Sequence, residues 1–179
     1  MTVEEFRLLP DPTEGSRYEL RAGKLASKPV PKNRYIYLQI RIRKLLEPEA
    51  GERAVVSTNW PFRATPEHEF RYADVALVNR MRFDRDNLDD NLHGAPELVV
   101  EVVSPSNTEE ELDEKEALCL ANGCREFWVV YPKGRYVRVA TGDTTRRYRE
   151  GDQIPLLLFP GQTIAVSEIF SILPSSSQG

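Results

Sequence analysis

Three charged residues stand at positions where the surrounding pattern favours apolar side chains. Asp74 lies in the strand-like segment RYADVALV (71–78), and Glu101 lies in the middle of the apolar run ELVVEVV (97–103). Such a run is typical of a central strand buried on both faces. A carboxylate buried there is costly unless it is paired, hydrogen-bonded or bound to a metal ion. The alternative for each acid is an ordinary salt bridge or an exposed place at a sheet edge.

Lys115 is the third such residue, because a helix predicted over 107–122 places it in the middle of the apolar face. At about 100° per residue, Leu112 and Cys119 fall on one side of Lys115, and Leu118 falls on the other. A lysine that points at the core needs an anionic partner or a chemical task. The alternative is an apolar stem that carries its ammonium group out to solvent.

The strand of Glu101 leads directly into the helix of Lys115, so both groups are expected at one end of a sheet, where open α/β sheets place their sites. Two strand carboxylates and an inward lysine suit metal-dependent hydrolysis of a phosphodiester. The carboxylates would hold a divalent cation that polarises the phosphate and acidifies water. The lysine would position or deprotonate that water, or stabilise the developing charge. Glu19, in RYELRAG, is a further candidate ligand; the alternative is an exposed strand acid.

The composition favours a cation with oxygen ligands. The chain has 179 residues, of which only two, His68 and His93, are histidines, and this excludes a multi-histidine zinc site. Carboxylate ligands favour Mg²⁺ or Mn²⁺. The net charge of −4 argues against a dedicated nonspecific nucleic-acid binder, which carries a basic surplus. It does not argue against a nuclease, because metal-binding acids lower the net charge.

Length and hydropathy indicate one domain and no membrane insertion. We predict a single domain over 1–173 and a flexible tail over 174–179. No apolar run approaches the roughly 18 residues that span a bilayer. The N-terminal segment MTVEEFRLLPDP lacks the apolar stretch of a signal peptide. We therefore expect a cytoplasmic protein.

The elements that must position these residues follow from hydrophobic periodicity and turn residues. The N-terminal part is predicted to form a short capped helix, a β-hairpin turning at Ala22-Gly23, and a helix over 33–46 that Pro48 and Gly51 end. Strands are predicted over 53–63, 71–78, 97–103, 126–131, 135–140 and 144–149. A charged loop is predicted over 80–95, and a last strand and helix within 153–173. Ser106 and Glu109 are predicted to form the capping box of the helix over 107–122. This order predicts an α/β fold with a mixed sheet flanked by helices.

Two further segments carry weaker signals. Arg34, Arg41 and Lys44 flank the apolar stripe of the helix over 33–46, where they would contact nucleic-acid phosphates or simply form a solvated face. Ser104-Pro105-Ser106 offers hydroxyl groups, but neither histidine is near it in the sequence. We interpret it as a strand-to-helix turn.

With these residues in view, the sequence resembles the Uma-two family of putative restriction endonucleases, within the PD-(D/E)XK nuclease superfamily. The resemblance covers nearly the whole chain, and the block ELVVEVVSPS, followed by a helix lysine and GCREFWVV, is highly specific. The matching segments are RYELRAGKL (17–25), ADVALV (73–78), the block from PELVVEVV to FWVVYP (96–132) and FPGQTIAVSEIF (159–170). The resemblance implies a restriction-endonuclease-like core with an N-terminal β-hairpin extension, and Mg²⁺-dependent or Mn²⁺-dependent cleavage of DNA.

The resemblance also assigns roles residue by residue. It places Asp74 at the superfamily's metal-binding aspartate, Glu101 at the acid of the (D/E)XK half-motif and Glu19 at the acid of the family's YEL segment. The lysine expected two residues after Glu101 is replaced by Val103. Lys115 on the following helix matches the position to which the family's lysine has moved.

Some positions depart from the family's pattern. Ala73 stands where a proline is usual, Cys119 where a tyrosine is frequent, and Asn33-Arg34-Tyr35 where a histidine is common. Two hypotheses follow. One is a metal-dependent endonuclease acting on DNA; the other is a catalytically weak or inactive module on the same fold that binds nucleic acid or protein. Because one domain carries one site, cutting both strands requires a homodimer or two visits.

Overall fold

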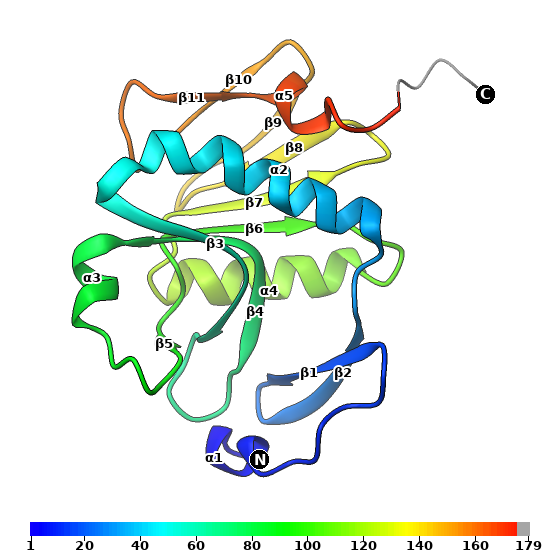
Figure 1. The fold of residues 1–179 in the computed structure, drawn as a ribbon, viewed down its shortest axis with the longest axis vertical. Helices are drawn as coiled ribbons and strands as arrows, with labels where there is room; N and C mark the ends of the chain where they lie inside the picture. The colour runs from blue at the N-terminus through cyan, green and yellow to red at the C-terminus, as the bar shows by residue number, and fades with distance from the viewer. Residues whose placement is uncertain (175–179) are drawn as a thin grey trace.

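A seven-stranded mixed sheet forms the centre of the molecule, with strand order β5-β3-β4-β6-β7-β8-β9 (Figure 1). The computed structural model describes residues 1–174. The sheet comprises β3 (Ala54–Arg63), β4 (Arg71–Asn79), β5 (Leu92–His93), β6 (Leu98–Val102), β7 (Glu126–Tyr131), β8 (Tyr136–Ala140) and β9 (Thr145–Arg149). Strands β6 and β7 are parallel, as are β3 and β5, and the other neighbours are antiparallel. Because all five residues of β6 are buried, Glu101 lies in a central strand, as predicted.

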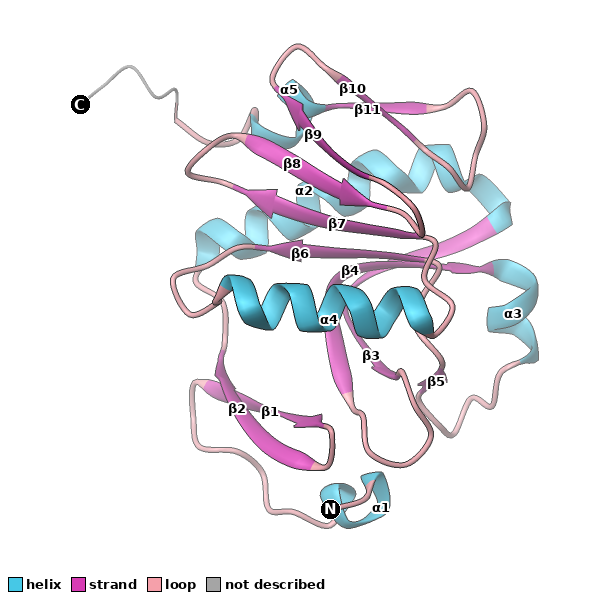
Figure 2. Cartoon of the chain, turned by 180° about the vertical axis from the view of Figure 1, so that it is seen from behind, coloured by secondary structure: helices cyan, strands magenta, loops and turns pink. Residues whose placement is uncertain are grey.

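Helices cover both faces of the sheet, which confirms the predicted fold class. α2 (Asn33–Ala50) crosses one face, and α4 (Glu109–Ala121) crosses the other, as the two opposite views show (Figures 1 and 2). The core on the α2 side includes Leu38, Ile42, Leu46 and Trp128. The core on the α4 side includes Leu112, Cys119, Phe127 and Val129. Burying each aliphatic side chain contributes about 1.5–3 kcal/mol, so both helices are fixed to the sheet.

The N-terminal hairpin is a separate two-stranded sheet of β1 (Ser16–Arg21) and β2 (Lys24–Pro29). Its turn is the predicted Ala22-Gly23 pair, and both residues have positive φ, at 44° and 75°. Leu20 and Phe70 exchange two backbone hydrogen bonds of 2.9 Å that attach the hairpin to the segment before β4. α1 (Val3–Arg7), the predicted short capped helix, lies beside it (Figure 1) and has Thr2 as its N-cap. The predicted hairpin extension is confirmed.

Two predicted boundaries differ from those of the structure. α2 does not end before Pro48 but continues to Ala50, where Gly51 caps it with a φ of 54°. Pro48 is exposed and removes only one helical hydrogen bond, whereas buried Leu46 and Ala50 hold the last turn against the core. The short helix η1 (Gly51–Arg53) then leads into β3. The predicted charged loop over 80–95 begins with α3 (Arg80–Arg85).

α4 begins two residues later than predicted. Its N-cap is Thr108, whose hydroxyl accepts the backbone N–H of Glu111 at 3.2 Å, while the Glu111 carboxylate accepts the Thr108 N–H at 3.4 Å. The predicted capping box of Ser106 and Glu109 is therefore wrong. The Ser106 hydroxyl instead pairs with that of Ser104 at 2.9 Å, within the turn that joins β6 to α4.

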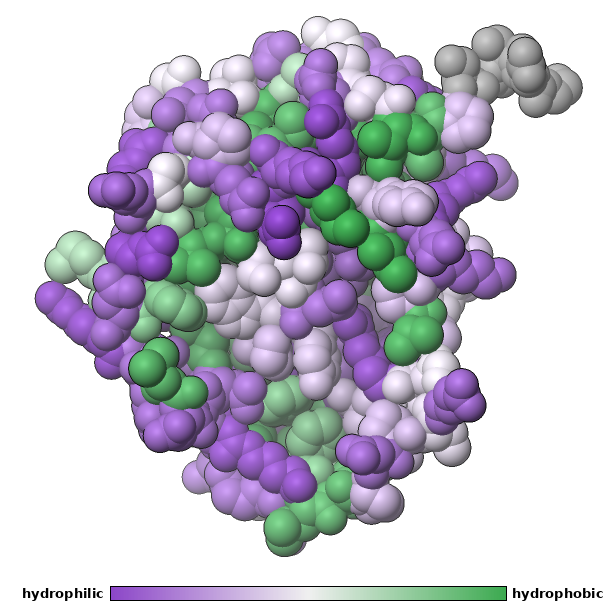
Figure 3. Space-filling view, viewed as in Figure 1, coloured by the Kyte–Doolittle hydropathy of each residue, from purple (hydrophilic) through white to green (hydrophobic). Residues whose placement is uncertain are grey.

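The C-terminal part adds a second small sheet of β10 (Gln153–Pro155) and β11 (Thr163–Ala165), followed by α5 (Val166–Phe170). α5 packs beside α2. The predicted tail over 174–179 starts at the described residue Pro174; residues 175–179 lie outside the described part, and the single domain over 1–173 stays a prediction. Among residues 1–174, no helix combines the length and apolar character needed to cross a membrane. On the α2 face, apolar side chains form separate groups among hydrophilic ones (Figure 3).

Candidate active site

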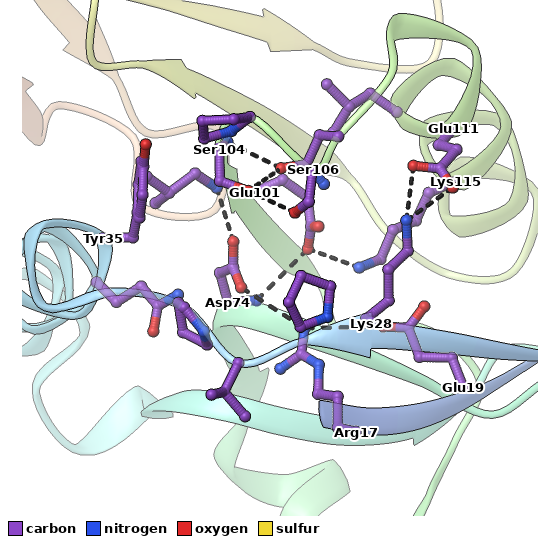
Figure 4. A pocket seen from close by; sticks show the side chains of 18 of the residues that line it. Arg17, Glu19, Lys28, Tyr35, Asp74, Glu101, Ser104, Ser106, Glu111 and Lys115 are labelled. Atoms are coloured by element: carbon purple, nitrogen blue, oxygen red, sulfur yellow. Dashed lines mark hydrogen bonds and ion pairs between the residues drawn. The ribbon is translucent and has the colours of Figure 1, made fainter. Parts of the chain in front are cut away.

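A cavity of about 230 Å³ opens where β6 ends and the turn to α4 begins. The hairpin β1–β2, the start of α2, the strands β4 and β6, and α4 all contribute to its walls. Glu19, Asp74, Glu101 and Lys115 line it together (Figure 4). The structure thus brings the four residues predicted to do chemistry to one place, from segments far apart in the sequence.

Asp74 and Glu101 lie at the point where the ladder between β4 and β6 ends. The last regular pair is Val75 with Val100. Beyond it, the Asp74 N–H donates to Oε1 of Glu101 at 3.4 Å, and the Val102 N–H donates to Oδ2 of Asp74 at 2.8 Å. Carboxylates therefore replace backbone carbonyls as acceptors, which holds both acids between the strands.

Lys115 points into this pair rather than to solvent. Its Nζ lies 2.8 Å from Oε1 of Glu101 and donates to the backbone carbonyl of Tyr72 at 2.6 Å. The buried residues of α4 are Leu112, Lys115 and Cys119, as the predicted helical face requires. The solvent-reaching stem is thus excluded, and the lysine has an anionic partner.

Burial and neighbouring charges shift the pKa values of Glu19, Asp74, Glu101 and Lys115. Burial raises the pKa of Glu101 to about 7, although Lys115 opposes the shift. Burial also raises the pKa of Asp74. Burial by itself lowers the pKa of Lys115, but Glu101, Glu19 and Asp74 outweigh it and hold the pKa above its ordinary value. For Glu19 the effect of burial is overcome by Lys115 and two arginines, and its pKa is lowered.

Arg17 is a site residue that sequence reasoning missed. Its Nη2 lies 3.8 Å from Oε1 of Glu19 and 3.9 Å from Oδ1 of Asp74. Its Nη1 donates to Oδ1 of Asn59 at 3.0 Å, and its guanidinium lies 4.9 Å from the ring centre of Tyr72. The alternation in RYELR is the available signal, because residues two apart on a strand point to the same face.

Asn59 marks a break in the strand pair that carries Asp74. Thr58 pairs with Val75 and Trp60 with Ala73, which leaves Asn59 across from Asp74. Asn59 has a φ of 51°, a left-handed conformation that asparagine tolerates better than most residues. Val75 packs in the core on the α2 side, whereas Ala73 packs on the α4 side. The regular alternation is therefore interrupted at Asp74.

A second group of missed residues joins the hairpin to α4. The Glu111 carboxylate accepts from Lys28 Nζ at 2.7 Å and from Arg21 Nη1 at 2.8 Å. Arg21 also donates to Glu19, with Nη2 3.0 Å from Oε2. Glu111 precedes Lys115 by one helical turn, so the same face of α4 contacts both the hairpin and the Asp74–Glu101 pair. Gln39 of α2 is buried and lines the cavity as well.

The donor set of the cavity matches a hard divalent cation. Within residues 1–174, no group of three or more His, Cys, Asp or Glu side chains is arranged to enclose a metal ion. Mg²⁺ does not need such a cage, because it keeps several waters and takes one or two carboxylates. Asp74 and Glu101 offer two carboxylates on one cavity wall, with oxygen as the only donor atom.

The predicted basic residues of α2 do not line this cavity. Arg41 forms an ion pair with Glu168 and donates from Nε to the Glu168 carbonyl at 2.8 Å, which ties α2 to α5. Lys44 is exposed on α2. Arg34, at the start of α2, lines a neighbouring hollow. Contact of these residues with nucleic acid stays a prediction.

Comparisons with known proteins bear on the family and the fold of the chain. A family model described as Uma2, putative restriction endonuclease, matches residues 3–167. A solved structure described as a putative nuclease belonging to DUF820, from Anabaena variabilis, is similar with a TM-score of 0.81 at 19% sequence identity. The similarity covers 96% of this chain and 98% of the other, and it shows that the two share a fold. No curated protein matches the chain.

Proposed function

The chain belongs to the Uma2 family of putative restriction endonucleases, and from this premise we propose that it is a metal-dependent endonuclease that hydrolyses phosphodiester bonds in DNA. The family and the structural neighbour indicate a nuclease. The observation that supports the mechanism most directly is the buried Glu101–Lys115 pair beside Asp74 on the wall of one cavity. A merely structural role gives a fold little reason to bury three charges at one strand end.

Asp74 and Glu101 are the proposed ligands of Mg²⁺ or Mn²⁺. When bound, such an ion polarises the phosphate and lowers the pKa of a coordinated water. The strand geometry prepares the two carboxylates for this task, because the Val102 N–H fixes the orientation of Asp74 and Lys115 fixes that of Glu101. Glu19 is the further candidate ligand; it is a carboxylate near neutral pH because its pKa is lowered.

Lys115 is proposed to position water and stabilise charge rather than to act as a base. Its neighbours hold its pKa above the ordinary lysine value, so it is an ammonium group near neutral pH. An ammonium group can donate hydrogen bonds, but it has no lone pair with which to accept a proton. Beside a phosphate it would stabilise the negative charge that develops during hydrolysis.

Cleavage assays with three neutral variants test this proposal. Asp74→Asn, Glu101→Gln and Lys115→Met are compared with the wild-type chain on plasmid and linear DNA, with Mg²⁺, Mn²⁺ or EDTA. Glu126→Gln is the matched control, because Glu126 is equally buried but lies outside the cavity. We expect cleavage by the wild type and the control only, at least about 100-fold above the three variants.

Two outcomes would count against the nuclease. If all three variants, folded by circular dichroism, still cut DNA, these residues do not perform the reaction. If the wild type binds DNA but cuts nothing with either metal, the inactive binding module is the better description. Cutting both strands of a duplex requires a homodimer or two visits by one site, and we propose the homodimer. Sedimentation velocity of the chain with and without duplex measures this assembly.

A further inference from the structure

A second hollow adjoins the cavity on the far side of the turn that joins β6 to α4. Its volume is about 890 Å³, and it shares Tyr35, Ser104 and Pro105 with the cavity. We call it the tyrosine groove, and its principal residues are Arg34, Tyr35, Pro105, Tyr131, Lys133 and Tyr136. The shared residues place the groove directly beside the candidate active site.

The charge of the tyrosine groove contrasts with that of the chain. Arg34 and Lys133 line it, and no aspartate or glutamate does. Within the described residues, neither cation forms an ion pair, whereas Arg17, Arg21 and Lys28 in the adjoining cavity are all paired with carboxylates. Cations left without partners in a chain of net charge −4 create a local positive field that attracts an anion.

The apolar part of the groove is an ordered aromatic surface. Tyr131 at the end of β7 pairs with Tyr136 at the start of β8, and their rings stack with centres 4.5 Å apart and planes 14° apart. Arg147 of β9 lies 4.4 Å from the Tyr136 ring centre, and the Tyr131 hydroxyl donates to Glu109 at 3.0 Å. These contacts hold both rings in place, so a ligand meets a surface that needs no ordering.

We propose that the tyrosine groove binds an unpaired strand of nucleic acid that leaves the candidate active site. The proposal rests on the proposed nuclease function and names the substrate class of the adjoining active site. Unpaired bases expose faces that pack on aromatic side chains, and their phosphates meet cations along the path. Arg34 and Lys133 hold phosphates, and Tyr35, Tyr131 and Pro105 hold bases, whereas Tyr136 supports the Tyr131 ring. Grooves lined by aromatic residues also bind proline-rich peptides, but the unpaired cations and the position beside the candidate active site favour nucleic acid.

Binding measured without metal tests the groove separately from cleavage. The probe is a fluorescein-labelled oligothymidylate of about 12 nucleotides, within the site sizes of single-strand grooves. A blunt duplex hairpin is the second probe, and EDTA prevents cleavage. Tyr131→Leu, Arg34→Gln and Lys133→Gln alter the groove. Tyr37→Leu on the exposed side of α2 and Lys24→Gln on β2 are the matched controls, since neither residue lines the groove or the cavity.

We expect each groove variant to bind the oligothymidylate about 5- to 10-fold more weakly, with the duplex affinity unchanged. Tyr131→Phe keeps the ring and is expected to lose less affinity than Tyr131→Leu. Each lost cation should also reduce the slope of log affinity against log salt by about 0.7. The control variants should stay within about twofold of the wild type.

Unchanged oligothymidylate affinity in all three folded groove variants overturns the proposal. So does an equal loss for duplex and single strand, because the groove would then not distinguish unpaired bases. The groove is assigned to a peptide if a proline-rich peptide displaces the oligothymidylate from the wild type and neither Arg34→Gln nor Lys133→Gln changes the oligothymidylate affinity. If the wild type cuts nothing but the groove variants lose the oligothymidylate, the nuclease fails and the groove stands.

Discussion

Asp74 and Glu101 are joined through the backbone of the strands that carry them: the Asp74 N–H donates to the Glu101 carboxylate at 3.4 Å, and the residue after Glu101 donates to the Asp74 carboxylate at 2.8 Å. The two acids therefore take the place of the next rung in the β4–β6 ladder. Their spacing is set by the sheet and not by free side-chain rotation. Four predictions follow from this arrangement and its neighbours.

The first concerns the Glu101–Lys115 ion pair. Lys115→Met leaves a buried carboxylate without its cation, so we expect a loss of about 3–5 kcal/mol in the free energy of unfolding at about pH 8. Adding Glu101→Gln should restore part of that loss. Urea denaturation of the two single variants and the double variant measures the coupling. Arg41→Met with Glu168→Gln, a more exposed pair, should give no more than about 1 kcal/mol. Additive losses at Glu101 and Lys115 would contradict the prediction.

The second prediction concerns the pH dependence of the free energy of unfolding. Burial raises the pKa of Glu101 to about 7, so the folded chain holds this proton more tightly than the unfolded chain. The resulting stability is fully present below about pH 4.5 and is lost as the pH rises through about 7. The free energy of unfolding of the metal-free wild type, relative to Glu101→Gln, should fall by about 1–3 kcal/mol across that window. A difference that stays flat or grows with pH would show that the carboxyl is not shifted upward.

The third concerns the metal ion. Millimolar Mg²⁺ or Mn²⁺ should raise the melting temperature of the wild type, since the ion binds the folded chain. The rise should be larger near pH 8 than near pH 6, because binding requires Glu101 to lose its proton. Thermal melts of the wild type beside Asp74→Asn and Glu101→Gln measure the effect. Both variants should lose it, and Glu126→Gln should keep it; an equal rise in all four proteins would place the ion elsewhere.

The fourth concerns the attachment of the hairpin. Glu111 accepts from Arg21 and Lys28, so Glu111→Gln should loosen β1–β2 while the central sheet stays intact. Hydrogen exchange should accelerate about 5- to 10-fold in the hairpin, with β6 and β7 unchanged. Thr108→Ala is the matched control, because it removes the other half of the capping box and leaves both hairpin contacts. If Thr108→Ala accelerates the hairpin equally, the cap and not the ion pairs is responsible.

Much of the fold could be predicted because local pattern and burial coincide. The apolar run around Glu101 became a central strand, and the helical face around Lys115 is buried as its periodicity required. The start of α4 could not be read in the same way. Ser106 and Thr108 each precede a glutamate by three residues, so local capping energies do not separate them. The contacts of Glu111 with Arg21 and Lys28 favour Thr108, and they are not visible in the local sequence.

A residue of the candidate site could be predicted only where its charge conflicted with the apolar pattern of the neighbouring sequence. Asp74, Glu101 and Lys115 are charges in apolar patterns, and that conflict identified them. Arg17 sits in a polar strand where a charge is ordinary, and its partners Asn59 and Asp74 lie far along the chain. Its role depends on the docking of the hairpin, which no local pattern encodes.

The parallel pairing of β6 with β7 has a consequence for how the chain is made. Glu101 is held in a strand whose neighbour lies beyond α4, so that strand is completed only after the whole crossover has been synthesised. A nascent chain on the ribosome therefore carries Asp74, Glu101 and Lys115 before the second edge of β6 is paired. We therefore expect the sheet that holds the candidate site to be complete only after β7 has been made.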